Sequence, residues 1–310
     1  MMTAHIRRQV DGILLLDKPI GLSSNAALQT IKRLYQARKA GHTGSLDPLA
    51  SGMLPICLGE ATKFSGLLLN ADKSYRFKCR LGITTRTGDA EGEVVRILPF
   101  GPLQPETVEA ALARFRGEIQ QIPPMYSALK HQGKRLYILA RQGVVVEREP
   151  RTVTIHTLRL LELGGEHLSC ELTCSKGTYV RTLVEDLGEL LGCGAHIVEL
   201  RRLGVAPYAA VPMITLTALQ ERAQQGLAAL DAVLLPVDSA IADWPVIYLQ
   251  GDAVHYLLSG QAVWLPKAPS QGWVRLYEEP AQRFLGIGEI LDDGRVAPRR
   301  LLVPTPEPLP

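Results

Sequence analysis

The stretch GHTGSLDPLASG, residues 41–52, places one carboxylate, that of Asp47, in a segment that fits neither a regular helix nor a regular strand. Pro48 disfavours the α region for Asp47, and the three glycines of the stretch allow backbone angles that other residues resist. The sequence therefore predicts a tight, non-repetitive loop that presents Asp47 from a fixed backbone.

Regular elements are predicted on both sides of this loop. The apolar run at 12–19 predicts a strand, and Ser24 or Asn25 caps a helix that ends near the first glycine of the loop. After the loop, the sequence predicts a buried strand at 53–59 and a helix at 60–69.

Alternating apolar and basic residues predict a strand at 75–81 and place Tyr75 on its buried face. Further along the chain, apolar residues at helical spacing predict a helix that starts close to Arg181 and stops at Gly192. The other elements predicted before residue 205 are a helix from Pro105 to Phe115 and strands around 152–162, 168–174 and 196–203.

The position of Arg181 is unusual, because a cation in the first turn of a helix is unfavourable by a few tenths to about 1 kcal/mol unless an anion partners it. Asp47 is one candidate for that anion. The alternatives are that Arg181 pairs with Glu185 one helical turn later, or that it reaches solvent.

Basic residues are concentrated in one segment, 124–151, although the chain as a whole carries a formal charge of only +3. Six cations and two acids give this segment +4. The basic residues are Lys130, Lys134, Arg135, Arg141, Arg148 and Arg151. An exposed insert of this kind can contact a phosphate backbone, and the alternative is a solvated surface loop.

The cysteines and the acidic residues of the sequence argue against disulfides, a cysteine metal site and a calcium loop. The five cysteines are odd in number and lie in apolar surroundings, which favours reduced thiols. Cys170 and Cys174 share one face of a predicted strand, and no second Cys or His pair stands at ligand spacing, so we expect no metal. Asp89 and Glu91 lack the spaced ligands of a calcium loop and are interpreted as a turn.

Length and hydropathy indicate a two-part chain. Its 310 residues suffice for a full hydrophobic core and a second, small domain. From about residue 247, short strands parted by Gly, Pro and Asp predict a small β-barrel-like domain, and the proline-rich end predicts a disordered tail at 305–310. No apolar run reaches the roughly 18 to 20 residues that span a bilayer, and no signal-peptide core is evident, so we expect a cytoplasmic protein.

Five blocks of this sequence, in the same order and at similar intervals, resemble the TruB family, the bacterial tRNA pseudouridine-55 synthases. The blocks are LLLDKPIGLSSN (14–25), GHTGSLDPLASGMLPICLGEATK (41–63), KSYRF (73–77), SKGTYVRTL (175–183) and LRRLG (200–204). The resemblance extends over nearly the whole chain. Ser45 stands where alanine is frequent in the family motif, a change between small residues.

The resemblance implies an α+β fold. It predicts a pseudouridine synthase domain at 10–245, with a mixed, mostly antiparallel central sheet, flanking helices and a cleft. The basic segment 124–151 corresponds to the family's inserted thumb. The C-terminal part, 247–304, corresponds to a small PUA-like domain.

The resemblance also implies roles for individual residues. Asp47 matches the essential catalytic aspartate, and Arg181 matches the arginine that pairs with it. Tyr75 matches the tyrosine that stacks on the target base and assists proton removal from C5. Tyr179 and Leu200 match positions that line the uracil pocket. His42 matches a histidine that the family uses near the flipped-out nucleotides. In the thumb, the expected RNA-binding residues are Lys130, Lys134, Arg135 and Arg141.

The implied activity is the isomerisation of uridine 55 in the T-arm loop of tRNA to pseudouridine, with the target base flipped out. The reaction breaks the N-glycosidic bond and rejoins the same uracil through C5, so we expect no cofactor or metal. A carboxylate can attack the sugar or the base, or remove a ribose proton, and the sequence does not choose among these routes. We expect tRNA as partner, no obligatory protein partner and a monomer.

Three rival interpretations remain. One is the archaeal and eukaryotic relative that works in guide-RNA particles, which lacks a comparable thumb and depends on partner proteins. Another is a non-catalytic RNA-binding protein, against which the intact set of Asp47, Tyr75 and Arg181 argues. The third is a hydrolase that uses Asp47 with His42, but this pair lacks the third group of an oriented triad.

Overall fold

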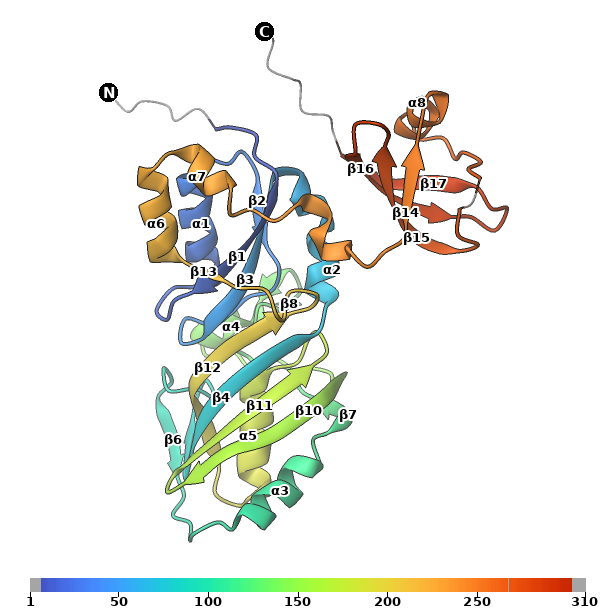
Figure 1. Cartoon of the computed structure of the whole chain (residues 1–310). Coiled ribbons are helices and arrows are strands. Elements are labelled where there is room, and N and C mark those ends of the chain that lie inside the picture. The colour runs from blue at the N-terminus through green and yellow to red at the C-terminus, as the bar shows by residue number, and fades with distance from the viewer. Residues whose placement is uncertain (1–6, 267, 303–310) are drawn as a thin grey trace.

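A nine-stranded sheet forms the centre of the molecule in the computed structural model, which describes residues 7–266 and 268–302 (Figure 1). Its order is β13-β1-β3-β12-β4-β11-β10-β7, with β2 added beside β3. The strands are β1 (Gly12–Lys18), β2 (Ala40–His42), β3 (Ser51–Leu58), β4 (Lys73–Leu81), β7 (Gly117–Gln121), β10 (Arg151–Gly164), β11 (His167–Cys174), β12 (Ala195–Val205) and β13 (Ile214–Thr215). The β1–β13 and β3–β12 pairs are parallel and the other pairs antiparallel, which confirms a mixed, mostly antiparallel sheet in an α+β fold.

Helices and short strands complete this part of the chain. They are α1 (Ser24–Leu34), the 3-10 helix η1 (Gly59–Phe64), α2 (Ser65–Asn70), β5 (Ile83–Thr85), β6 (Val94–Ile97), α3 (Pro105–Ala113), α5 (Val180–Leu190), α6 (Leu216–Gln224), α7 (Leu227–Asp231) and η2 (Val237–Ile241). One apolar core lies between α3, α5 and the β4–β12 half of the sheet, and another lies between α1, α6, α7 and the β1–β3 half. All five cysteines are buried and free, as predicted.

The two halves of the sheet are joined by a very short contact. Strands β3 and β12 pair only at Ser51 with Arg201 and at Gly52 with Arg202. The loop that carries Asp47 ends directly before this pairing. Asp47 therefore lies where the two halves of the sheet separate. Figure 1 shows β3 above β12 and β4.

Two helices differ from the sequence predictions. Ser23, not Ser24 or Asn25, caps α1, because its side chain accepts a hydrogen bond from the Ala26 N–H at 3.1 Å. This helix ends at Leu34 rather than near Gly41. The single helix predicted at 60–69 is instead η1 followed by α2, and the Thr62 hydroxyl bonds back to the Gly59 carbonyl within the tighter turn.

The predicted strands 75–81, 152–162, 168–174 and 196–203 are confirmed within longer strands of the sheet. Strand β4 alternates buried and more exposed residues, with Tyr75 on the buried side. The helix predicted from Pro105 is α3, and the helix predicted from Arg181 to Gly192 is α5.

The basic segment leaves the sheet at the end of β7 and returns at β10. It contains β8 (Lys130–His131), β9 (Lys134–Arg135) and α4 (Leu136–Arg141), and β8 pairs only with β9 among the described strands. We refer to residues 122–150 as the insert.

The C-terminal part contains an open sheet, so the prediction of a β-barrel-like domain is wrong. The sheet order is β14 (Val246–Leu249), β15 (Gly272–Glu278), β16 (Arg283–Ile290) and β17 (Val296–Leu301), and α8 (Asp252–Leu258) was not predicted. The segment 262–266, predicted as a strand, makes one bridge, from Val263 to Val296, and Pro266 follows closely. The predicted tail at 305–310 lies outside the described residues.

The C-terminal sheet packs on the rest of the chain through an apolar cluster that includes Phe64, Ile241 and Ile287. Beside it, the buried Asp238 carboxylate accepts hydrogen bonds from Arg275 at 3.1 Å and from the Tyr277 hydroxyl at 2.5 Å. Within the described ranges, no helix has the length and hydropathy needed to cross a membrane.

Candidate active site

The backbone on both sides of Asp47 is held by the segment that follows β1. The Ser24 hydroxyl accepts a hydrogen bond from the Leu46 N–H at 2.7 Å and donates one to the Leu46 carbonyl at 3.0 Å. On the other side, the Gly21 N–H donates to the Pro48 carbonyl at 2.8 Å. Asp47 therefore lies between two residues whose backbone positions are fixed by another segment.

A glycine is required where the loop enters β3. Gly52 has a φ of +99°, and a Cβ at this position would lie 2.2 Å from the carbonyl oxygen of Arg202. Any other residue would push β3 away from β12. Gly52 thus allows the short contact between the two halves of the sheet beside Asp47.

The predicted pairing of Asp47 with Arg181 is confirmed. The Arg181 Nε lies 2.9 Å from Asp47 Oδ2. The other guanidinium nitrogens donate to the Thr87 carbonyl and to the Tyr126 carbonyl, both at 2.7 Å. Neither alternative, pairing with Glu185 or exposure to solvent, describes this side chain, which is 6 % exposed.

Asp89 is a second carboxylate at this site, and the sequence interpretation of a simple turn missed it. Its Oδ2 lies 3.8 Å from the Arg181 Nε, and its side chain is as buried as that of Arg181. The Thr87 hydroxyl and the Glu91 N–H both donate to Asp89 Oδ1. The turn at 87–91 therefore folds around Asp89 and directs it toward Arg181.

The charged groups of the site shift one another's pKa values. Burial raises the pKa of Asp47 above its ordinary value; Arg181 opposes this rise and Asp89 adds to it. Burial lowers the pKa of Lys18 to about 8, against the attraction of Asp47 and Glu91. The Lys18 ammonium donates to the Pro19 and Leu22 carbonyls, so it also fixes the segment that holds the Asp47 loop.

The charge of Asp47 acts on the Tyr75 hydroxyl. Tyr75 belongs to the same apolar cluster as Leu46, Ala50 and Leu200. Burial raises the pKa of its hydroxyl. Arg202 lies beside it, hydrogen-bonds to the hydroxyl and opposes that rise. Arg202 is 1 % exposed and also donates to the Met53 and Gly44 carbonyls, so this guanidinium joins Tyr75 to the Asp47 loop.

Tyr179 stands at the N-cap position of α5, two residues before Arg181, and is half-buried. Its hydroxyl pKa is raised by burial, and both Arg181 and Asp47 contribute to its electrostatic surroundings. The structure thus brings Asp47, Arg181, Tyr75 and Tyr179 together, although they come from three separate parts of the chain.

His42 is the last residue of β2, and the charge of Arg135 in the insert acts on it. Burial lowers its pKa, and the charges of Arg202 and Arg135 act in the same direction. Its Nδ1 is buried without a hydrogen-bond partner among the described residues. An unpaired ring nitrogen between the loop and the insert is suited to a polar partner that arrives with a ligand.

The four residues of the insert that are expected to bind RNA are all exposed. Within the described residues none of Lys130, Lys134, Arg135 and Arg141 forms an ion pair, although most other arginines of the chain do. The Arg141 guanidinium lies over the Tyr137 ring at 5.6 Å. Arg135 is the one of these four cations whose charge acts on a predicted site residue, because it lowers the pKa of His42.

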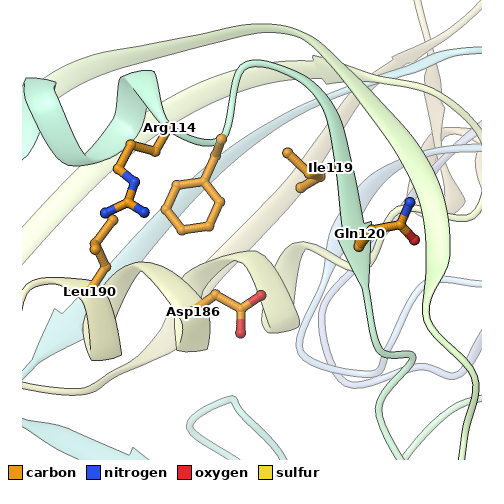
Figure 2. Close-up of a pocket in the computed structure, with 6 residues that line it drawn as sticks. Arg114, Ile119, Gln120, Asp186 and Leu190 are labelled. Carbon is orange, nitrogen blue, oxygen red and sulfur yellow. The ribbon is translucent and has the colours of Figure 1, made fainter.

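A cavity of about 490 Å³ lies elsewhere, between α3, β7 and α5, and contains none of the predicted site residues. Figure 2 shows Asp186 pointing from α5 toward this space and Ile119 facing it from β7. Asp186 and Leu190, which line this cavity, belong to α5, the helix that also carries Arg181.

Several residues that build this site were not predicted from the sequence. The sequence interpretation makes Ser24 a helix cap and Asp89 part of a turn, and it assigns no role to Arg202 or to Gln121, the last residue of β7, which hydrogen-bonds to the Tyr179 backbone. Each acts on a backbone group or side chain far away in the chain, and no local periodicity reports such a contact. Ser24 and Arg202 lie within the quoted blocks, whereas Asp89 and Gln121 lie outside them and carry no such signal.

Comparison with known proteins identifies the fold and the family of this chain. The fold is that of the pseudouridine synthases. A chain in the crystal structure of a Cbf5-Nop10-Gar1 complex matches it with a TM-score of 0.72 and 25 % identity, over 97 % of this chain and 86 % of that one. A structure of an H/ACA RNP bound to a substrate RNA containing 2'-deoxyuridine matches with a TM-score of 0.71 and 23 % identity, over 98 % and 88 %.

The sequence comparisons narrow the assignment. Residues 32–180 match the N-terminal domain of the TruB family pseudouridylate synthases, residues 181–242 the tRNA pseudouridylate synthase B C-terminal domain, and residues 245–302 the pseudouridine synthase II TruB C-terminal region. "tRNA pseudouridine synthase B" of Nitrosococcus oceani is 57 % identical, over 95 % of this chain and 96 % of its own. The protein of the same name from Ectopseudomonas mendocina is 58 % identical, over 96 % and 97 %. The chain therefore belongs to the TruB family of pseudouridine synthases, which are isomerases.

Proposed function

We propose that this enzyme isomerises uridine 55 in the T-arm loop of tRNA to pseudouridine and that Asp47 is its essential catalytic residue. The observation that carries the proposal is the Asp47 carboxylate, which is anchored by the buried Arg181 yet 40 % exposed. The two relatives described above, each named tRNA pseudouridine synthase B, support tRNA as the substrate.

The two oxygens of Asp47 differ in a way that suits this chemistry. Oδ2 is held by Arg181, whereas Oδ1 has no hydrogen-bond partner among the described residues. Arg181 opposes the rise in the Asp47 pKa that burial causes and so favours the ionised carboxylate, whose open oxygen can act on the nucleoside as nucleophile or base. The N1–C1' bond breaks, the uracil turns, C5 joins C1', and the C5 proton leaves while N1 takes up a proton. Atoms and electrons balance without a cofactor.

The proposed reaction requires a flipped-out base, because the glycosidic bond of a stacked uridine in a folded loop is not accessible. We assign the pocket for this base to Tyr75, Tyr179 and Leu200, whose side chains border the Asp47 loop. Tyr75 would stack on the uracil and assist removal of the C5 proton. His42 would contact the displaced nucleotides. Extrusion costs a few kcal/mol of stacking, which these contacts would offset.

We assign the insert as the thumb that grips the T-arm. The support is its four exposed cations, which form no ion pair with any described residue, and the electrostatic contact of Arg135 with His42. These cations are Lys130, Lys134, Arg135 and Arg141. Each cation that contacts a phosphate releases counterions, so binding should weaken as salt rises.

We further propose a catalytic domain at 10–245 and a PUA-like domain at 247–304, of which residues 303 and 304 lie outside the described residues. The enzyme would act in the cytoplasm, as a monomer and without an obligatory protein partner. The 57–58 % identity of this chain to the tRNA pseudouridine synthase B relatives supports this assignment over the guide-RNA-dependent branch, because its identity to the matched chain of the Cbf5-Nop10-Gar1 complex is only 25 %.

The direct test is pseudouridine formation in a synthetic T-arm stem-loop with one target uridine, using the purified chain without added metal or nucleotide. Wild type should form product, and Asp47→Asn should form none while its RNA affinity stays within roughly tenfold, because the amide keeps the shape and loses the carboxylate. Asp293→Asn, an equal change on the exposed C-terminal sheet, is the matched control and should retain activity.

Other outcomes have distinct meanings. Salt-sensitive RNA binding without product from wild type would indicate a guide-dependent or purely RNA-binding protein. Product from Asp47→Asn at the wild-type rate would exclude Asp47 as the essential group.

A further inference from the structure

Gln121 makes an unusual contact at the point where the insert begins. It is the last residue of β7, and it is 2 % exposed. Its amide nitrogen donates to the Tyr179 carbonyl at 3.1 Å, and its amide oxygen accepts from the Tyr179 N–H at 3.0 Å. One buried side chain therefore satisfies both backbone groups of a residue 58 positions away.

This contact pairs one of the free backbone N–H groups at the start of α5, that of the N-cap residue itself. Tyr179 is the N-cap residue of α5, and its own side chain makes no capping hydrogen bond. Helix starts leave N–H groups unpaired, and a side chain normally satisfies them from within the same segment. Here Gln121 fixes the start of α5 from another strand, and Arg181 follows two residues later.

A second contact joins the insert to the same helix turn. Tyr126, five residues after Gln121, accepts a hydrogen bond on its carbonyl from Arg181 Nη2 at 2.7 Å. Gln121, the residue directly before the insert, thus contacts Tyr179, and Tyr126 of the insert contacts Arg181. Both contacts lie next to the Asp47 pair.

A cavity of about 490 Å³ borders this junction on its other side and is lined by Ile119 and Gln120 of β7 and by Asp186 and Leu190 of α5 (Figure 2). Ile119 also packs against the apolar cluster that contains Val180 and Leu183 of α5. The hydrogen bonds of Gln121 therefore add a directional contact to apolar packing that is interrupted by this cavity.

We propose that Gln121 is a positioning residue that, together with the Tyr126 carbonyl, links the insert to Tyr179 and Arg181, so that RNA seated on the insert orients the Asp47–Arg181 pair. This inference rests on the proposed function for its catalytic consequence. The link itself is a property of the RNA-free protein.

The first test compares Gln121→Glu with Gln120→Glu, the same change one residue earlier on the same strand. Gln120 is exposed and bonds to the Thr152 hydroxyl. A carboxylate at position 121 cannot donate to the Tyr179 carbonyl. We expect its single-turnover rate constant to fall about 10- to 100-fold, because small displacements of reacting groups are costly, with T-arm affinity within about threefold. Gln120→Glu should match wild type in both.

Protonation gives a readout that a merely structural role would not produce. A protonated carboxyl regains a donor, so the rate of Gln121→Glu relative to wild type should rise as the pH falls from 8 to 6. Gln121→Met, which fills a similar volume without any hydrogen bond, should be slow at every pH. The proposal would be overturned if Gln121→Glu lost T-arm affinity with an unchanged rate constant. It would also be overturned if wild type, Gln121→Glu and Gln121→Met had equal pH profiles.

A measurement without substrate separates this proposal from the proposed function. In protein with 15N-labelled arginine, the Arg181 Nε–H resonance should shift in Gln121→Glu and Gln121→Met but not in Gln120→Glu. If wild type makes no pseudouridine, the proposed function fails, yet this shift still tests the link. An unchanged resonance in both Gln121 variants, with melting temperatures near wild type, would refute it. If Gln121→Glu does not fold, Gln121→Met supplies both readouts.

Discussion

The Arg181 guanidinium is 6 % exposed, whereas the Asp47 carboxylate that it contacts at 2.9 Å is 40 % exposed. The cation of this pair is fixed from the inside by Thr87, Tyr126 and the nearby Asp89. The anion forms part of the surface that an incoming nucleoside would cover. Covering it would exclude water and strengthen its attraction to Arg181 at the moment when the carboxylate is needed.

Arg181→Lys should lower the rate of isomerisation at least about 100-fold while the protein stays folded. A lysine ammonium keeps the charge but cannot reach Asp47 and two separate carbonyls with the planar geometry of a guanidinium. Single-turnover kinetics on the T-arm stem-loop would measure this effect. Arg201→Lys is a matched control, because Arg201 forms an ion pair with Asp17 on the neighbouring part of the sheet. Equal rates for both variants would contradict the special role of the Arg181 geometry.

Tyr75→Phe should separate stacking from proton transfer. The variant keeps the ring on the buried face of β4 but loses the hydroxyl beside Arg202, so T-arm affinity should stay within about threefold. If the hydroxyl assists removal of the C5 proton, the rate constant should fall by roughly 10²- to 10⁴-fold. Tyr75→Leu should lower both the T-arm affinity and the rate constant. Tyr248→Phe on the C-terminal sheet should change neither. A fully active Tyr75→Phe enzyme would limit the residue to stacking.

Local pattern was sufficient for most of the regular elements. The alternation in 75–81 gave both the strand and the buried face of Tyr75, because side chains in a strand alternate between faces. For Arg181, the position at the wrong end of a helix dipole indicated only that an anion was needed, and the family resemblance identified that anion as Asp47.

Contacts that depend on tertiary placement were not predictable in the same way. Asp89 and Gln121 act on residues 92 and 58 positions away, and nothing in their immediate sequence specifies a partner. The C-terminal barrel was wrong for a related reason: short apolar runs do not reveal whether two edge strands meet, and here β14 and β17 remain at opposite edges of an open sheet.

Removing the charges of Lys130, Lys134 and Arg135 by alanine substitution should weaken T-arm binding and flatten its salt dependence. If each side chain contacts one phosphate, the slope of log K against log salt should decrease in magnitude by about 2. The rate constant at saturating RNA should change less than the affinity. The control is the alanine triple variant of Arg76, Arg80 and Arg159, each of which forms an ion pair on the sheet: Arg76 and Arg159 share Glu171, and Arg80 pairs with Glu166. Identical salt slopes for the two triple variants would make the insert an ordinary surface loop.

Glu185, one helical turn after Arg181, should make the enzyme less stable as the pH rises through neutrality. Burial raises the pKa of this carboxyl from 4.5 to about 7; Asp186, Asp89 and Glu189 act in the same direction, and Arg181 opposes them. The folded state therefore binds this proton more tightly than the unfolded state. The resulting stabilisation is complete below about pH 4.5 and is lost as the pH rises through about 7.

Glu185→Gln keeps a neutral group at this position at every pH. Its free energy of unfolding, measured by urea denaturation at pH 5, 6, 7 and 8, should exceed that of wild type by a margin that grows with pH, by about 1 to 2 kcal/mol across this range. Glu189→Gln, on the exposed side of the same helix, should run parallel to wild type. If the difference between Glu185→Gln and wild type is the same at pH 5 and at pH 8, the Glu185 carboxyl does not titrate near neutrality, and the acidic surroundings of Arg181 are more open to water than their burial indicates.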